Sequence, residues 1–264
     1  MGRYEKAKHS KKLQVKSKIL IIIFYAIIIF CMVYFVYKII IFNQNKSIYE
    51  EINVNQEEPN IDIENMNANF SQNMQKVIKL KQENEDVVGW IQIENTIIDY
   101  PILQTTDNSY YLTHNYKKEN SKYGSIFAKS ECNIQDNNSN FIIYGHNMKD
   151  EQMFNTLLKY ENKDFYNEHK EIKVSTESEE SRYSIVSVFK SRVFYQDEKN
   201  VFRYYNYIKF ENEQEYNTFI ENCKKNQLYD TGVSAKYGEQ LITLITCEYS
   251  QENGRIVIVA KKES

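Results

Sequence analysis

A cysteine, a histidine and an arginine lie at the ends of three apolar runs, where together they could carry out nucleophilic acyl transfer. Cys247 closes the apolar run 240–246, Arg255 opens another run eight residues later, and His146 follows the run 140–144 after one glycine. A cysteine is a nucleophile only as the thiolate, so it needs a nearby proton carrier or positive charge. A guanidinium can also donate hydrogen bonds to a developing oxyanion. These residue types therefore supply a nucleophile, a proton carrier and an anion stabiliser.

Taken singly, each of these residues has a more ordinary explanation. A cysteine in a strand is most often a small buried apolar residue, and a lone arginine most often makes a surface ion pair. His114 and His169 lie among charged and polar neighbours, where an exposed histidine is the simpler interpretation. A hairpin would bring Cys247 and Arg255 to the same rim of a sheet. It is this joint arrangement that favours catalysis.

The N-terminal part of the 264-residue chain has the pattern of a membrane anchor. Residues 19–37 carry no charge and residues 19–42 contain only Lys38, a length that spans a hydrocarbon core of roughly 30 Å. Seven Lys or Arg residues and one Glu precede it. The positive-inside rule therefore predicts a cytoplasmic tail at 1–18, a transmembrane anchor at 19–42 and an extracellular remainder, which is type II topology. A cleaved signal peptide is the alternative, but the run is too long and no small-residue cleavage site follows it.

Charge and cysteine content exclude several classes of function. The net charge of −3 conceals a distinctly acidic exported part, because the basic residues gather in the tail, and this argues against nucleic acid as a partner. Cys31 lies in the anchor, and the other three of the four cysteines have no metal-ligand spacing. We expect no metal and no cofactor. A disulfide between Cys132 and Cys223 stays open as an alternative to three free thiols.

Hydrophobic periodicity divides the exported part into a polar stalk, 43–69, and one domain, 70–264. The stalk is rich in Asn, Glu, Gln and Asp and has little apolar periodicity. Helical spacing predicts helices over 70–85, over 153–165 with Asp150 as N-cap, and over 213–225. Strands are expected at 87–93, 96–103, 123–128, 140–144, 171–175, 182–194, 240–246 and 255–261. The fold class is therefore mainly β with inserted helices, a closed β-barrel of about eight strands preceded by a helix.

The chain resembles the sortases, the membrane-anchored cysteine transpeptidases of Gram-positive cell walls. Their signature is Thr-Leu-x-Thr-Cys at a strand end, with an arginine shortly after it and a histidine earlier. Residues 243–247, Arg255 and His146 match this signature. The flanks resemble class B in particular, at 144–148, 153–154, 247–249, 252–261, 88–91, 99–104, 107–112 and 124–127. The resemblance covers about 70–262 and implies the sortase-like closed barrel with an N-terminal helix.

The resemblance implies a two-step acyl transfer through a thioester. Cys247 would attack the carbonyl of a short sorting motif near the C-terminus of a secreted protein. His146 would protonate the departing amine, and Arg255 would stabilise the oxyanion. An amine of a peptidoglycan cross-bridge, or of its lipid-linked precursor, would then resolve the thioester.

The same analogy suggests residues that line the peptide groove. These are Asn108 and Tyr144, together with Thr246 and Glu248 beside the nucleophile. The calcium site of another sortase class is not expected, because the acidic residues that could form it are scattered.

Two other functions remain open. A pilin-polymerising sortase would use the same chemistry with a lysine of another protein as the acceptor. A catalytically silent, membrane-tethered binding module would be favoured by the loss of Cys247, His146 or Arg255, but all three are present. A papain-like peptidase would instead place its cysteine at a helix N-terminus.

Overall fold

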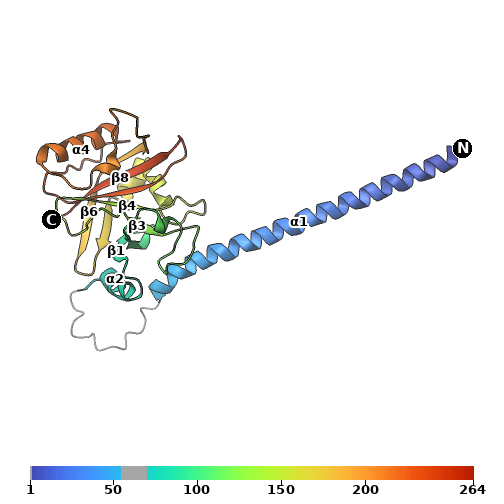
Figure 1. Ribbon diagram of the computed structural model, residues 1–264, viewed down its shortest axis with the longest axis horizontal. Coiled ribbons are helices and arrows are strands. Elements are labelled where there is room, and N and C mark those ends of the chain that lie inside the picture. Colours follow the sequence, from blue (N-terminus) through green and yellow to red (C-terminus); the bar gives the residue numbers. More distant parts are fainter. Residues whose placement is uncertain (1, 55–69) are drawn as a thin grey trace. The chain divides into compact units, whose positions relative to one another are not determined.

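The computed structural model describes residues 2–54 and 70–264, in two compact units, Met1–Glu58 and Pro59–Ser264. The first unit contains one helix, α1 (Gly2–Val54). Its segment Lys18–Gln44, part of the long helix in Figure 1, is long and apolar enough to cross a membrane. This agrees with the predicted anchor. The helix continues to Val54, so the first part of the expected stalk is helical, and residues 55–69 lie outside the described residues.

Eight strands of the second unit close into a barrel, as the sequence predicts (Figure 1). The strands are β1 (Val87–Gln92), β2 (Asp99–Leu103), β3 (Ile126–Ala128), β4 (Asn140–Tyr144), β5 (Glu171–Ser175), β6 (Glu180–Arg192), β7 (Leu241–Cys247) and β8 (Gly254–Lys262). Their order around the barrel is β1-β2-β3-β4-β7-β8-β6-β5, and β5 pairs with β1 to close it. The pairs β2–β3 and β4–β7 are parallel, and the others are antiparallel.

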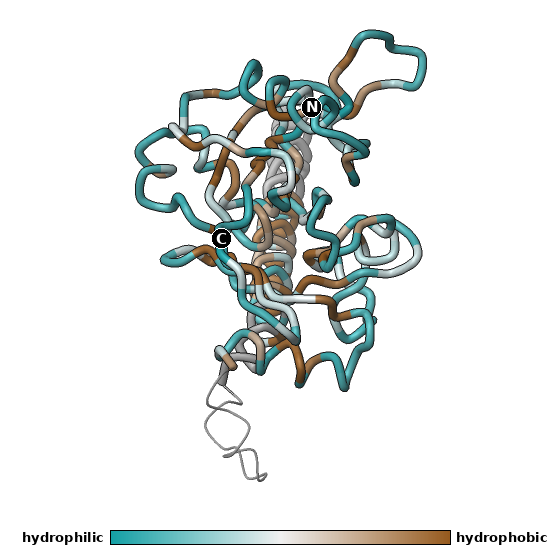
Figure 2. The backbone as a smooth tube through the Cα atoms, turned by 90° about the vertical axis from the view of Figure 1, so that its left-hand side faces the viewer, coloured by the Kyte–Doolittle hydropathy of each residue, from teal (hydrophilic) through white to brown (hydrophobic). Residues whose placement is uncertain are grey.

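The hydrophobic core lies along the central strands β4, β7 and β8. In β7 every residue before Cys247 is buried, and in β8 residues 256–260 are buried without interruption. Strands that are covered on both faces read as continuous apolar runs rather than as alternating ones. Figure 2 shows short hydrophobic stretches separated by hydrophilic ones along the chain. The C-terminal end of β7 and the N-terminal end of β8 therefore continue directly from buried stretches of strand.

Two α-helices pack against the barrel where the sequence places them. Helix α2 (Gln72–Glu83) packs on β1, and its N-cap Ser71 accepts a hydrogen bond from the Met74 amide. Helix α4 (Glu213–Asn226), capped by Asn212, packs on β6 (Figure 1). Their apolar spacing and their polar caps are the two signals that predict these helices.

The helix predicted over 153–165 is wrong in type and in start. The chain instead forms a 3-10 helix, η3 (Asn155–Glu161), and a short α3 (Lys163–Glu168) that is capped by Asn162. Glu151 and Met153 have φ of 63° and 59°, a left-handed conformation that cannot begin an α-helix. Asp150 caps no helix there and accepts a hydrogen bond from the Tyr123 hydroxyl.

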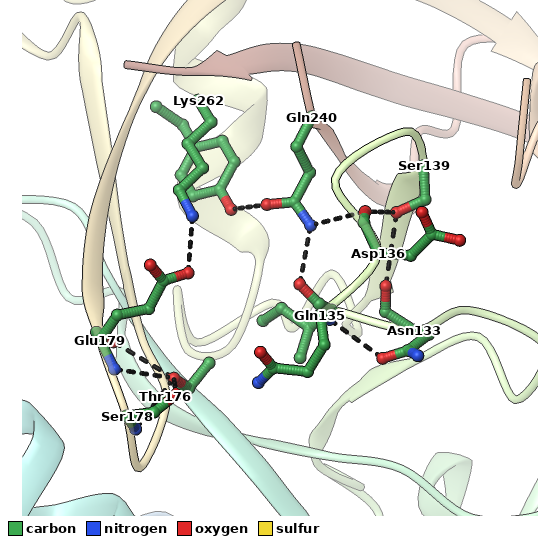
Figure 3. Close-up of polar contacts among 11 residues, drawn as sticks. Asn133, Gln135, Asp136, Ser139, Thr176, Ser178, Glu179, Gln240 and Lys262 are labelled. Atoms are coloured by element: carbon green, nitrogen blue, oxygen red, sulfur yellow. Dashed lines mark hydrogen bonds and ion pairs between the residues drawn. The ribbon is translucent and has the colours of Figure 1, made fainter. Parts of the chain in front are cut away.

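A polar network around Gln240 lies at the N-terminal end of β7 (Figure 3). Gln240 accepts a hydrogen bond from the Tyr183 hydroxyl at 2.8 Å and donates to the carbonyls of Ile134, at 2.7 Å, and Asp136, at 3.0 Å. The network ties β6 and β7 to the loop that precedes β4. Because Cys247 ends β7, this network lies at the opposite end of the strand from the thiol.

Candidate active site

The backbone register places His146 and Cys247 at equivalent positions on neighbouring parallel strands. Tyr144 pairs with Ile245 at the end of the β4–β7 ladder, and each of the two site residues lies two positions further on. The Gly145 amide donates to the Ile245 carbonyl at 3.3 Å, and the Thr246 hydroxyl donates to the Gly145 carbonyl at 2.7 Å. The strand ends that carry the imidazole and the thiol are thus bonded directly to each other.

Asn147 adds a side-chain bridge between the two strand ends. Its amide nitrogen donates to the Cys247 carbonyl at 2.8 Å, and its amide oxygen accepts from Asn155 at 2.7 Å. Sequence reasoning assigned no role to Asn147, because an asparagine after a strand is ordinary turn chemistry. The structure makes it the side chain that joins the histidine loop to the nucleophile.

The loop that follows His146 folds back tightly on it. Asn147 bridges to Met153, and the Phe154 amide donates to the His146 carbonyl at 2.9 Å. At Gly145 a Cβ atom would lie 2.7 Å from the Phe154 ring and 2.4 Å from the Ile126 side chain, so only glycine allows this approach. The histidine backbone is therefore held by strand β7 on one side and by its own loop on the other.

Arg255 lies directly opposite Cys247 across the β7–β8 pair, as the hairpin argument predicts. Its guanidinium donates to the carbonyls of Asn253, at 3.2 Å, and Gly254, at 2.8 Å. In the part of the chain that the structure describes, it makes no ion pair with a carboxylate. The surface ion pair that explains most lone arginines is absent there, and the cation remains available to an anionic group.

Only one of the three cysteines in this unit is accessible. Cys132 and Cys223 are buried and free, so the alternative disulfide between them is not formed. Burial raises the pKa of the Cys132 thiol to about 11 and raises the pKa of Cys223 well above its ordinary value. Cys247 is half-buried at the barrel rim. Of these three thiols, Cys247 alone is placed to react.

Two tyrosines, Tyr144 and Tyr204, lie close enough to Arg255 for its charge to act on their hydroxyls. Burial raises the pKa of the half-buried Tyr144 and of the buried Tyr204, and the nearby charge of Arg255 acts against the rise in both. The Tyr204 hydroxyl, in the 3-10 helix η4 (Tyr204–Asn206), is buried without a hydrogen-bond partner. Nothing in the sequence distinguishes Tyr204 from the many other tyrosines.

The four residues expected in the peptide groove differ in their contacts and in their burial. Tyr144 lies near Arg255, as its electrostatics indicate. Asn108 is exposed, donates to the Glu131 carboxylate at 3.0 Å and accepts from the Ser130 amide at 2.7 Å. Those contacts fasten the loop that carries Asn108 to the loop after β3.

Thr246 and Glu248, the neighbours of the nucleophile, are both buried. The Thr246 hydroxyl is bonded to the Gly145 carbonyl. Burial opposes ionisation of Glu248, but hydrogen bonds from the amide and hydroxyl of Ser250, together with Lys190 at 3.5 Å, lower its pKa below the ordinary value.

Within residues 2–54 and 70–264, no three His, Cys, Asp or Glu side chains are grouped to hold a metal ion. The chemical groups at the rim are a thiol, an imidazole and a guanidinium. A thiol with a proton carrier and an anion stabiliser is the equipment of covalent acyl transfer.

The site matches a known family. The family model of the sortase domain matches residues 91–263. Sortase B of Listeria monocytogenes is 39% identical over 184 residues, which are 69% of this chain and 72% of that protein. Sortase B of Staphylococcus aureus is 34% identical over 186 residues, with the same coverage of 69% and 72%. The structure of a Staphylococcus aureus sortase B–substrate complex aligns with a TM-score of 0.64 and 31% identity over 72% of this chain and 86% of that chain. The chain therefore belongs to the sortase family and, within it, to the class B cysteine transpeptidases, which anchor surface proteins to the cell wall.

Proposed function

We propose that Cys247, His146 and Arg255 are the catalytic residues of this transpeptidase. One observation carries the proposal: Cys247 has Arg255 as its cross-strand partner on β8 and His146 at the equivalent position beyond β4. A single strand end thus has a cation on one side and a proton carrier on the other. The absence of a carboxylate partner for Arg255 in the described chain supports its role toward an oxyanion.

The roles follow from the chemistry of each group. The Cys247 thiolate attacks the carbonyl carbon of the scissile amide, and the Arg255 guanidinium donates hydrogen bonds to the oxyanion that forms. His146 gives a proton to the amine nitrogen as the carbon–nitrogen bond breaks, which leaves a thioester on Cys247. An incoming amine then attacks the thioester and returns its proton to His146, and the thiolate leaves. Protons and bonds balance over the two steps.

The donor in this proposal is a secreted protein with a C-terminal sorting motif, and the acceptor is a peptidoglycan cross-bridge amine or its lipid-linked precursor. We assign Asn108, Tyr144, Thr246 and Glu248 to the peptide groove on the family resemblance. Tyr144, which lies in the field of Arg255, has the strongest support among these four.

The apolar segment of α1 supports an anchored enzyme of type II topology. Lys18–Gln44 is the candidate span, and the basic residues precede it. The N-terminal tail then lies in the cytoplasm and the barrel lies outside the cell. Protease treatment of intact cells tests this topology, since it should degrade the barrel and leave an epitope on the tail protected.

The test of the activity uses the full-length chain in detergent. Fluorogenic sorting-motif peptides are incubated with hydroxylamine, which intercepts a thioester, and Cys247→Ala is compared with Cys132→Ala, which removes a buried thiol. Cleavage with hydroxamate formation by the parent and by Cys132→Ala, but not by Cys247→Ala, is the expected result. Failure to cleave any peptide, or equal cleavage by Cys247→Ala, would overturn the assignment.

A second assay addresses the acceptor. Short amine-terminated cross-bridge peptides and a protein that presents lysines compete for the thioester. Transfer to the cross-bridge peptide supports cell-wall anchoring, whereas transfer to protein lysine alone would favour the pilin-polymerising alternative.

A further inference from the structure

The structure distinguishes the two ring nitrogens of His146. Its Nε2 lies 2.8 Å from the carbonyl oxygen of Leu112, which lies 34 residues earlier in the chain. A carbonyl oxygen can only accept, so Nε2 must keep a proton to make this bond in both the neutral and the cationic imidazole. We propose that Nδ1 of His146 is the nitrogen that exchanges protons during acyl transfer, and that the Leu112 carbonyl, held by Gly124, positions the ring. This inference rests on the proposed role of His146.

The other two histidines of the barrel unit, His114 and His169, contact a backbone carbonyl through Nδ1 instead of Nε2. Nδ1 of His114 lies 2.8 Å from the Tyr110 carbonyl, and Nδ1 of His169 lies 2.9 Å from the Phe165 carbonyl, each four residues back in the chain. Both rings also stack on the aromatic ring of the same partner, at 4.1 Å. In both histidines the carbonyl belongs to a residue of the same turn of chain, and it is contacted by Nδ1 and not by Nε2. His146 alone among these three uses Nε2, and its partner comes from a different segment.

Gly124 fixes the carbonyl that His146 contacts. Gly124 has φ of +57°, and a Cβ atom there would lie 2.4 Å from the Tyr111 carbonyl oxygen and 2.8 Å from that of Leu112. The next amide, Ser125, donates to the Tyr111 carbonyl at 2.9 Å. The backbone at Gly124 therefore packs directly against the segment that presents the Leu112 oxygen, and no larger residue fits without moving it.

A buried side-chain network holds the same segment from the other side. The Tyr111 ring is buried, and its hydroxyl accepts from Asn84 at 2.9 Å and donates to Asp86 at 2.8 Å. Lys118 pairs with Asp86 at 3.0 Å. The bond between His146 and Leu112 is exposed, where water competes for both partners. This bond can therefore orient the imidazole only if the Leu112 carbonyl is already fixed. The hydrogen bonds of the neighbouring Tyr111 fix that segment.

This arrangement determines which ring nitrogen of His146 carries a proton at each step. In the imidazolium both nitrogens carry protons, and Nε2–H stays bonded to the Leu112 oxygen. The Nδ1 proton passes to the leaving amine nitrogen, which gives neutral imidazole with the remaining proton on Nε2. The incoming amine later returns a proton to Nδ1. Because Nε2 never changes its bonding, the ring does not need to flip between the two half-reactions.

The direct test is nuclear magnetic resonance of the full-length chain with 15N-labelled histidine, in detergent. The measurement is made in the Cys247→Ala background at about pH 9, above the ordinary range of histidine titration. We expect neutral His146 to be protonated on Nε2, while His114 and His169 are protonated on Nδ1 and serve as internal controls. A proton on Nδ1 of His146 would overturn the proposal. This readout needs no catalysis, so its failure would leave Cys247-dependent transfer intact and is distinguishable from failure of the proposed function.

The positioning role is tested with a pair of matched glycine variants. Gly124→Ala should displace the Leu112 carbonyl, whereas Gly232→Ala, with φ of +74° and nothing within 4 Å of the added Cβ, has the same kind of backbone strain without the displacement. General acid–base catalysis contributes roughly 10²–10⁴-fold, so a misplaced but present imidazole should lower kcat roughly tenfold. KM should change little, and the 15N signals of His146 should shift in Gly124→Ala alone. Unchanged kcat and 15N signals in folded Gly124→Ala would overturn the role.

A milder variant covers the case in which Gly124→Ala does not fold. Tyr111→Phe removes only the hydroxyl that anchors the segment, and Tyr183→Phe removes an equally buried hydroxyl that is bonded to Gln240 instead of to this segment. The first should lower kcat and shift the 15N signals of His146, and the second should do neither. Equal effects of the two substitutions would contradict the proposal.

Discussion

Cys247 and Arg255 face each other in a non-hydrogen-bonded pair of the β7–β8 ladder. They are Cα partners, and the adjoining pair is the hydrogen-bonded one, because the Glu248 amide donates to the Gly254 carbonyl at 3.0 Å. In an antiparallel ladder the two kinds of pair alternate, and in the non-hydrogen-bonded kind the Cα atoms are only about 4.5 Å apart, with both side chains on one face. The backbone ladder itself therefore sets the spacing of the thiol and the guanidinium.

That relationship predicts that lysine cannot replace Arg255. Arg255→Lys keeps the charge but loses the planar fork of donors, so kcat/KM for peptide cleavage should fall by about 10²-fold, the loss typical of one oxyanion donor. Steady-state kinetics with a fluorogenic peptide measures this. Arg182→Lys, an exposed arginine near the other end of β6 that pairs with Glu171, is the control and should leave kcat/KM unchanged. Comparable activity of Arg255→Lys and the parent would contradict the role.

Burial predicts which thiols react. At about pH 7.5 iodoacetamide should alkylate Cys247 more than about a hundredfold faster than Cys132 or Cys223, because burial raises the pKa values of the latter two and shields them. Peptide mapping by mass spectrometry of the folded chain measures the three rates. Denaturant should abolish the difference, and rapid labelling of Cys132 before unfolding would be inconsistent with the structure.

The contact of Asn108 with Glu131 predicts a pH-dependent loop. The Asn108 amide, the Ser130 hydroxyl and Lys129 lower the pKa of Glu131 to about 2 against the partial burial that opposes them. A carboxyl with a depressed pKa in the folded state contributes stability above its unfolded pKa and loses it as the pH falls toward the folded value. The loop contact should therefore weaken between about pH 4.5 and pH 2.

Asn108→Ala should move the Glu131 titration upward, toward the ordinary carboxyl range. Side-chain carboxyl resonances measured as a function of pH report it directly. Asn226→Ala, on the exposed end of α4, should leave the midpoint where it is. An unshifted Glu131 in Asn108→Ala would show that the amide does not hold the carboxylate.

The network around Gln240 predicts a stability effect without a chemical one. Gln240→Ala removes the hydrogen-bond partner of the buried Tyr183 hydroxyl and of the Ile134 carbonyl, and one of the two donors to the Asp136 carbonyl, so the free energy of unfolding should fall by about 2 to 4 kcal/mol. Denaturant titration measures this, with Gln214→Ala on the exposed face of α4 as the control. The kcat of the folded fraction should stay at the parent value, because Gln240 lies at the far end of β7 from Cys247.

Local sequence signals predict the strands and the placement of Cys247 and Arg255 at one rim of the barrel. Apolar runs bounded by polar loops predicted all eight strands, and the short separation of Cys247 and Arg255 made a hairpin the natural connection. His146 follows an apolar run, whereas His114 and His169 lie among polar and charged neighbours. The resemblance to sortases then joined the three residues into one site.

What sequence reasoning missed depends on contacts between distant segments. The parallel pairing of β4 with β7 joins residues about a hundred positions apart, and no local pattern encodes its register. Asn147 and the Leu112 carbonyl acquire their roles only through that pairing and through the loop at Gly124. The helix expected from Met153 onward failed because Met153 itself has a left-handed backbone, which apolar spacing does not reveal.

The three proposed site residues come from segments that are far apart along the chain. His146 follows β4, whereas Cys247 ends β7 and Arg255 lies in β8. A nascent or truncated chain that stops before β8 lacks the guanidinium and leaves β7 with an open edge where β8 should pair. Truncation before β8 should therefore give a molecule that can pair with another chain at that open edge, and in which the Cys247 thiol has no cross-strand partner.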